Sequence, residues 1–164
     1  MVTTHHPIKI IVWNVRGAGS RECIISIKEY IRTHKPAIIA ILETHISGKR
    51  ADEVCNNIGF QGRYRVEARG FQGGIWVLWD TSEVSLNVLK AHPQFITSQV
   101  HRRGMQPWCF TVVYASPSPQ LREQLWCEME AFSGSVKMPW MFAGDFNETK
   151  NIEERDHGGD DMVR

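Results

Sequence analysis

Polar side chains stand at the ends of three apolar segments of this sequence. Asn14 follows one run, Glu43 ends a second, and Asp145 and Asn147 follow a third. Magnesium takes oxygen ligands and is usually held by one or two carboxylates plus a phosphate. Side-chain amides can orient a carboxylate, a water or a phosphate oxygen. If the three segments are strands that end side by side, these residues predict a divalent-cation site suited to phosphate chemistry.

The segments that would position these groups have strand and helix patterns. The β-branched run 8–15 ends in a glycine-rich turn and predicts a buried strand. Apolar residues at helical spacing predict a helix over 22–34, which Lys35-Pro36 ends. The run 37–43 is apolar up to its last residue, which is typical of a strand covered on both faces.

The rest of the chain continues as a series of strands with two more helices. A glycine-rich turn joins the first two of these strands, which predicts a hairpin. Strands are predicted over 60–69, 73–80, 84–89, 95–101, 108–115 and 139–143, and helices over 51–58 and 118–132. We therefore expect an N-terminal tail over 1–7 and one α/β domain over 8–164.

Composition limits the function classes without selecting one. The chain has 164 residues, with 19 Lys and Arg against 18 Asp and Glu, for a formal net charge of +1. A domain of this length can bury about 70% of the surface of its unfolded chain. The balanced charge indicates neither a nucleic-acid partner nor a cationic one. Residues 143–164 hold seven of the 18 acidic groups, and Asp145 differs from the rest because its neighbours are apolar.

Cysteines and apolar runs predict a soluble intracellular protein. The four cysteines have no paired spacing and no secretory leader precedes them, so reduced, mostly buried thiols are expected. The apolar runs are far shorter than the about 20 residues that cross a bilayer, so no membrane partner is expected. Five tryptophans lie in apolar patterns and are predicted core residues, with Trp108 left open: Trp13, Trp76, Trp79, Trp126 and Trp140.

At the polar strand ends, the sequence resembles the endonuclease/exonuclease/phosphatase superfamily. The motifs that match are Trp13-Asn14, Leu42-Glu43-Thr44, Val113-Tyr114 and Gly144-Asp145-Phe146-Asn147, in the family's order and spacing. Within the superfamily, the stretches WNVRGAG, LETH, GGIWVLWD, VVYASPS and GDFNETKN resemble the endonuclease domain of plant LINE-type (non-LTR) retrotransposons.

The resemblance implies a fold and a set of roles. The fold is a deoxyribonuclease-like four-layer α/β sandwich, in which two mixed sheets flanked by helices carry a metal site at one end. Glu43 would be the principal metal ligand with Asn14 beside it, and Asp145 would activate or orient the attacking water. Asn147 would position Asp145 and the phosphate, and Tyr114 would donate a hydrogen bond to a phosphate oxygen. The implied cofactor is Mg²⁺, with Mn²⁺ as a substitute.

The remaining implied contacts concern the substrate, which would be DNA. No obligate protein partner is implied. Four residues in or beside the motifs are candidates for substrate contacts: Arg16 for the DNA backbone, and Thr44, His45 and Ser116 for lining the cleft. Taken singly, several assignments have simpler interpretations. Gly-Asp-X-Asn is typical of a turn, an acidic strand end is usually solvated, and a tyrosine near a strand end is usually a core residue.

The sequence also departs from the family pattern. Family members carry a late Asp and a final Ser-Asp-His motif, and these 164 residues contain neither. His157 lies in an acidic, glycine-rich stretch and is not accepted as that His. We therefore expect a truncated domain without its C-terminal strands, with unpaired sheet edges and absent or impaired activity. A nuclear location follows from the retrotransposon analogy alone.

Three functional hypotheses remain open at this point. The first is a divalent-metal-dependent DNA endonuclease domain of retrotransposon origin, impaired by truncation. The second is a remnant that binds nucleic acid without catalysis or has no role. The third is a phosphatase or phosphodiesterase of the same superfamily that acts on a small phosphorylated molecule.

Overall fold

A computed structural model describes residues 6–148, which form two four-stranded sheets and three helices. The first sheet contains, in spatial order, β1 (Ile10–Asn14), β2 (Ile38–Leu42), β4 (Ile75–Trp79) and β3 (Gly62–Val66). The second contains β5 (Ser85–His92), β6 (Phe95–His101), β7 (Trp108–Tyr114) and β8 (Trp140–Asp145).

Both sheets are mixed. Strands β1 and β2 run parallel, and β4 pairs antiparallel with both β2 and β3, so that β3 and β4 form the predicted hairpin. In the second sheet β5, β6 and β7 are antiparallel and β8 runs parallel to β7. In each sheet the parallel pair places two strands' carboxyl ends at the same edge, where the predicted polar residues lie.

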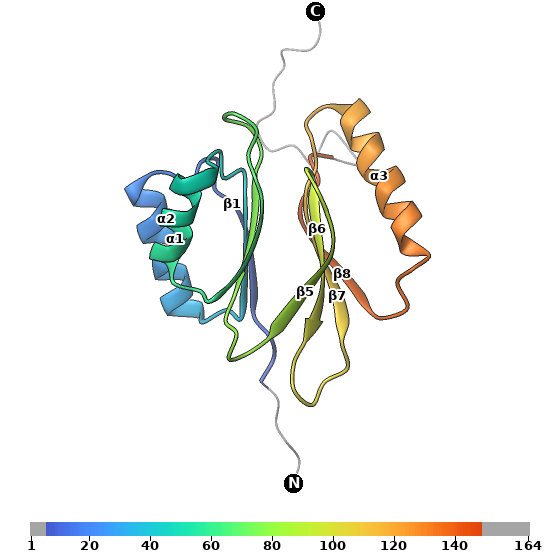
Figure 1. The fold of residues 1–164 in the computed structure, drawn as a ribbon, viewed down its shortest axis with the longest axis horizontal. Helices are drawn as coiled ribbons and strands as arrows, with labels where there is room; N and C mark the ends of the chain where they lie inside the picture. Colours follow the sequence, from blue (N-terminus) through green and yellow to red (C-terminus); the bar gives the residue numbers. More distant parts are fainter. Residues whose placement is uncertain (1–5, 149–164) are drawn as a thin grey trace, which may run out of the picture.

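Helices cover the outer faces of both sheets, as Figure 1 shows. Helices α1 (Arg21–His34) and α2 (Gly48–Ile58) lie on the first sheet, and α3 (Pro119–Ser133) lies on the second. Trp76 and Leu78 of β4 pack with the buried faces of α1 and α2, while Phe95 and Val113 pack with the buried face of α3. The four layers confirm the predicted α/β sandwich of deoxyribonuclease type.

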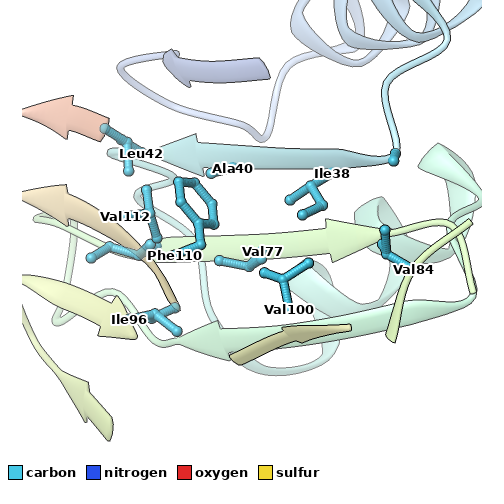
Figure 2. Packing of buried hydrophobic residues seen from close by; sticks show 11 residues of the cluster. Ile38, Ala40, Leu42, Val77, Val84, Ile96, Val100, Phe110 and Val112 are labelled. Atoms are coloured by element: carbon cyan, nitrogen blue, oxygen red, sulfur yellow. The ribbon is translucent and has the colours of Figure 1, made fainter. Parts of the chain in front are cut away.

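The main core lies between the two sheets (Figure 2). Alternation along β2 divides its side chains between two clusters. Ile38, Ala40 and Leu42 face the second sheet, while Ile39 and Ile41 face the helices. All five residues of β2 are at most 1% exposed, which confirms a strand covered on both faces. Burial on both sides fixes the register of β2 and therefore the position of the residue that follows it.

Local signals explain the helix ends and the differences from prediction. The Ser20 hydroxyl accepts a hydrogen bond from the Cys23 amide (3.0 Å), which caps α1, and Lys35 ends it with a left-handed φ of 47°. Helix α2 begins at Gly48, three residues before its predicted start. The sequence pattern missed this first turn because its residues are polar and show no apolar spacing. Strand β3 is shorter than the predicted 60–69.

The prediction that Trp126 belongs to the core was wrong. Its side chain is 42% exposed on α3 and stacks in parallel on Phe146, with ring centroids 6.1 Å apart. By contrast, Trp76 is fully buried.

Within residues 6–148, β1 and β8 are edge strands, and Met141 and Phe142 of β8 are 39% and 41% exposed. No helix in this range has the length and apolar character needed to span a membrane.

Candidate active site

The ends of four strands bring the predicted polar residues together. Asn14 is the last residue of β1, Glu43 follows β2, Tyr114 ends β7 and Asp145 ends β8. Tyr114 and Asp145 are direct partners in the parallel pair. The site therefore lies where the parallel pairs of the two sheets meet at one end of the sandwich.

Asn14 joins the two carboxylates. Its side-chain nitrogen donates to Glu43 Oε1 at 2.9 Å and to Asp145 Oδ2 at 3.0 Å. Its side-chain oxygen accepts from the backbone amide of Arg16 at 3.2 Å. One amide group thus holds together two acidic residues that are 102 positions apart in sequence. Figure 1 labels β1 and β8, the strands that end at Asn14 and Asp145. In this orientation Asn14 acts on the carboxylates as a donor.

The backbone around Glu43 is held from both sides. The amide of Gly17 donates to the Glu43 carbonyl at 2.7 Å, and the amide of His45 donates to the Gly73 carbonyl at 3.1 Å. The His45 side chain also approaches the carboxylate, with Nε2 3.3 Å from Glu43 Oε2. Glu43 is therefore fixed by the loops that follow β1 and precede β4, in addition to β2.

Asp145 and Asn147 form a tight turn after β8. The Asn147 amide donates to Asp145 Oδ1 at 3.0 Å, and its side-chain nitrogen donates to the Ala115 carbonyl at 2.6 Å. The Ala115 amide in turn donates to the Asp145 carbonyl at 2.8 Å. Both carboxylate oxygens of Asp145 therefore accept a hydrogen bond, and the turn is tied to the end of β7.

Backbone strain concentrates at this site. Among the described residues, five non-glycine residues have a positive φ, and Lys35 ends a helix. The other four are Glu43 itself and residues close in sequence to Asn14, Glu43 or Asp145: Arg16 (49°), Glu43 (53°), His45 (59°) and Asn147 (45°). Left-handed conformations of such residues are uncommon and cluster at functional sites, where the surrounding structure enforces them. This observation is independent of the side-chain contacts and points to the same place.

Tyr114 faces Glu43 and is half-buried. Burial raises the pKa of its hydroxyl well above the usual value, and a hydrogen bond to Glu43 and the charges of Glu43 and Asp145 raise it further, while Arg16 lowers it. The hydroxyl therefore stays protonated and keeps its ability to donate a hydrogen bond throughout the neutral and mildly alkaline range.

This shift predicts a stability effect at alkaline pH. The folded protein holds the Tyr114 proton more tightly than the unfolded chain does. The contribution of Tyr114 to the free energy of unfolding is therefore complete below about pH 10 and is lost as the pH rises further. We expect the free energy of unfolding of the parent to fall more than that of Tyr114→Phe between about pH 8 and about pH 10.5. Urea unfolding at both pH values measures this, and equal losses in the two proteins would contradict it.

The four predicted substrate contacts occupy different positions. Arg16 is exposed beside Asn14, and His45 is partly exposed beside Glu43. Thr44 is fully buried, and its hydroxyl finds no hydrogen-bond partner in the described part of the chain; it lies against Gly74. Ser116 is partly buried, and its amide and carbonyl bond to Gln94 and Arg122. His157 lies outside the described residues.

A family model supplies the decisive comparison. The model of the Endonuclease/Exonuclease/phosphatase family matches residues 11–160, which is most of the chain. The chain belongs to the endonuclease/exonuclease/phosphatase family. A comparison with curated proteins found no match.

Solved structures with the fold of this family include several nucleic-acid enzymes. AP endonuclease LMAP from Leishmania major has a TM-score of 0.70 at 14% identity, over 93% of this chain and 59% of that one. TDP2 from D. rerio, complexed with a single-strand DNA product, has a TM-score of 0.65 at 17% identity, over 87% and 62%. The endonuclease domain of TRAS1, a telomere-specific non-LTR retrotransposon, has a TM-score of 0.61 at 13% identity, over 88% and 61%. The chain spans less than two thirds of the length of each.

The donor set fits a divalent cation of the kind on which this family generally depends. Within residues 6–148 there is no cluster of three or more His, Cys, Asp or Glu side chains placed as metal ligands. Two carboxylates on one shared amide nitrogen are nevertheless a suitable partial site, because Mg²⁺ takes one or two carboxylates and leaves its other positions to water and phosphate. A cation there would also offset the repulsion between the two negative charges.

Sequence reasoning missed one exposed aromatic residue at this end of the molecule. Phe71 is 88% exposed at the tip of the loop between β3 and β4. Arg69 and Gln72 exchange both backbone hydrogen bonds (3.0 and 3.2 Å), and Gly70 has a φ of 61°, as a two-residue hairpin turn requires. A single aromatic residue inside a glycine-rich turn was the available signal.

Proposed function

We propose that this chain is a divalent-metal-dependent phosphodiesterase domain that acts on DNA, of the plant LINE-type retrotransposon kind. In this proposal Glu43 holds the cation, Asp145 takes a proton from the attacking water, and Asn147 positions Asp145. Tyr114 donates a hydrogen bond to a phosphate oxygen, and Arg16 and His45 lie where they could contact the substrate. The cation is Mg²⁺, with Mn²⁺ as a substitute.

The shared Asn14 contact is the observation that carries the proposal. It brings Glu43 and Asp145 within 3.0 Å of one nitrogen atom, although no structural core requires two acidic residues at this position. Keeping two carboxylates so close costs stability unless a positive charge compensates them. A structural role alone would be served better by one acidic residue, so the pair favours a cation and phosphate chemistry.

Each residue has a chemical task that its environment supports. A bound cation neutralises charge that develops on the phosphate and lowers the pKa of water. Asp145 can accept a proton because hydrogen bonds from Asn14 and Asn147 fix the carboxylate and leave lone pairs free. The surroundings of Tyr114 keep its hydroxyl protonated, so its single O–H can pass from Glu43 to a phosphate oxygen when substrate binds.

Phe71 favours DNA over a small phosphorylated molecule. The loop that carries it is bonded to the site, since the amides of Thr44 and His45 donate to the carbonyls of Gly74 and Gly73. An aromatic side chain that projects from this loop could reach a polymer that extends beyond the scissile phosphate, and could stack on a base or a sugar. A small substrate confined between Glu43 and Asp145 would not need it.

Phe71→Ala is therefore expected to weaken DNA binding about tenfold, because stacking on one base is worth about 1–3 kcal/mol. Fluorescence anisotropy with labelled DNA in EDTA measures binding without cleavage. Met105→Ala is the matched control, because Met105 is an exposed apolar residue (42%) in the turn between β6 and β7, at the opposite end of the sandwich. Equal effects of the two substitutions would contradict a specific contact.

Supercoiled-plasmid nicking by the 164-residue chain, with Mg²⁺ or EDTA, tests the proposed function. We expect nicking to require Mg²⁺ and to be slow. The rate should be low because these residues contain no Ser-Asp-His motif. The same chain should not hydrolyse a small phosphate monoester. DNA binding without any metal-dependent cleavage would favour the non-catalytic remnant, and hydrolysis of the monoester alone would favour the small-molecule phosphatase.

A further inference from the structure

Arg122 of α3 is the most deeply buried charged residue in the described part of the chain, with 9% of its surface exposed. It belongs to none of the motifs discussed above. A guanidinium is costly to bury unless several acceptors surround it. The contacts of Arg122 therefore indicate what the residue does.

Arg122 joins two segments that leave the second sheet at the candidate active site. Its Nη1 atom donates to the carbonyls of Ser116 (2.9 Å) and Pro117 (2.8 Å), in the loop after β7. Its Nε and Nη2 atoms both lie 2.9 Å from Glu148 Oε2, in the segment after β8. Charge-assisted hydrogen bonds of this kind are short and geometrically specific.

Both segments carry groups of the site. The β7 loop begins at Ala115, which bonds to the Asp145 carbonyl through its amide and to the Asn147 side chain through its carbonyl. Gln94, 7% exposed, ties the same loop to α3: its side-chain oxygen accepts from the Ser116 amide (2.6 Å), and its side-chain nitrogen donates to the carbonyl of Leu121 in α3 (2.7 Å). The loop is thus fixed by two nearly buried side chains.

We propose that Arg122 is a positioning residue for Asp145 and Asn147. Through Glu148 it fixes the chain immediately after Asn147, whose left-handed backbone (φ 45°) needs support from its surroundings. Through Ser116 and Pro117 it fixes the loop that receives the Asn147 side chain. The kinetic consequence of this role rests on the proposed function, whereas its structural consequence does not.

Glu148→Ala tests the role without leaving a large cavity. The Glu148 side chain is 57% exposed, and its loss leaves the bonds from Arg122 to the two carbonyls in place. We expect kcat for Mg²⁺-dependent nicking to fall about tenfold with KM for DNA unchanged, since one positioning contact is lost and no substrate contact is. Glu148→Gln retains an acceptor oxygen and should restore most of the rate. The control, Glu53→Ala, removes an exposed carboxylate paired with Arg50 on α2 and should leave both constants unchanged.

Amide hydrogen exchange in the full 164-residue chain gives a readout that does not depend on activity. In Glu148→Ala we expect the Asn147 and Ala115 amides to exchange at least tenfold faster, with the Leu125 amide of α3 unchanged. Unchanged exchange at Asn147, or faster exchange throughout the chain, would overturn the positioning role, as would a normal kcat in an active protein. Faster local exchange in a chain that does not nick DNA would support the role and contradict the proposed function.

Discussion

Glu43→Gln is expected to remove the response of the protein to Mg²⁺ while the fold persists. In the parent, Mg²⁺ should raise the melting temperature, because a cation offsets the repulsion between Glu43 and Asp145. In the variant this repulsion is already gone, since glutamine has the shape of glutamate without its charge. The melting temperature in EDTA should therefore equal or exceed that of the parent, and added Mg²⁺ should no longer raise it.

The same substitution should reduce plasmid nicking by a factor of about one hundred or more. Metal-assisted charge stabilisation is worth several kcal/mol in the transition state, and about 1.4 kcal/mol corresponds to a tenfold change in rate. Glu53→Gln is the matched control, because Glu53 lies on the outer surface of α2 and contacts Arg50 at 3.4 Å. An equal Mg²⁺ shift in parent and Glu43→Gln would show that Glu43 does not hold the cation.

The elements of this fold were predictable because their patterns are local. The run 37–43 is apolar at every position before Glu43, so it could be recognised as a strand buried on both faces, and Ile38 and Ile39 indeed pack in different clusters. The same local reasoning failed for Trp126, because its apolar neighbours along α3 gave no sign that the indole is 42% exposed to solvent. Local patterns identify an element better than they identify which of its side chains are covered.

The site could be predicted in composition but not in geometry. Polar residues after apolar runs indicated which side chains converge, since parallel strands end at the same edge of a sheet. The bridging role of Asn14 could not be read in the same way, because its contact with Asp145 spans 131 residues and depends on how the two sheets face each other. Arg122 left still less of a signal, as a single arginine on an amphipathic helix is normally solvated.

Gly144→Ala is expected to have the largest effect on stability. Gly144 has a φ of 152°, and a Cβ atom there would lie 1.9 Å from the Val113 carbonyl oxygen and 2.8 Å from the Val113 backbone nitrogen and carbonyl carbon. These atoms belong to β7, the neighbouring strand, so the clash cannot be relieved by rotating a side chain. We expect the free energy of unfolding to fall by about 4 kcal/mol or more, as is typical of severe backbone or core disruption.

This loss should lower the melting temperature by about 10 °C or more, because 1 kcal/mol shifts a domain of this size by about 2–4 °C. Gly134→Ala, at the end of α3, is the control: its φ is −60° and no atom lies within 4 Å of the added Cβ. There alanine should be neutral or slightly stabilising, since it restricts the unfolded chain. Equal melting temperatures for the two variants would contradict this account.

The position of Gly144 also explains why the pairing of β8 with β7 determines the position of Asp145 in the motif Gly144-Asp145-Phe146-Asn147. Gly144 pairs with Val113, and the next pair in the register is Tyr114 with Asp145. A side chain at position 144 would push β8 away from β7 and separate Asp145 from both Tyr114 and Ala115. Any Gly144→Ala protein that remains folded should therefore have lost Mg²⁺-dependent nicking as well, and a folded, fully active variant would show that close approach of β8 to β7 is not what places Asp145.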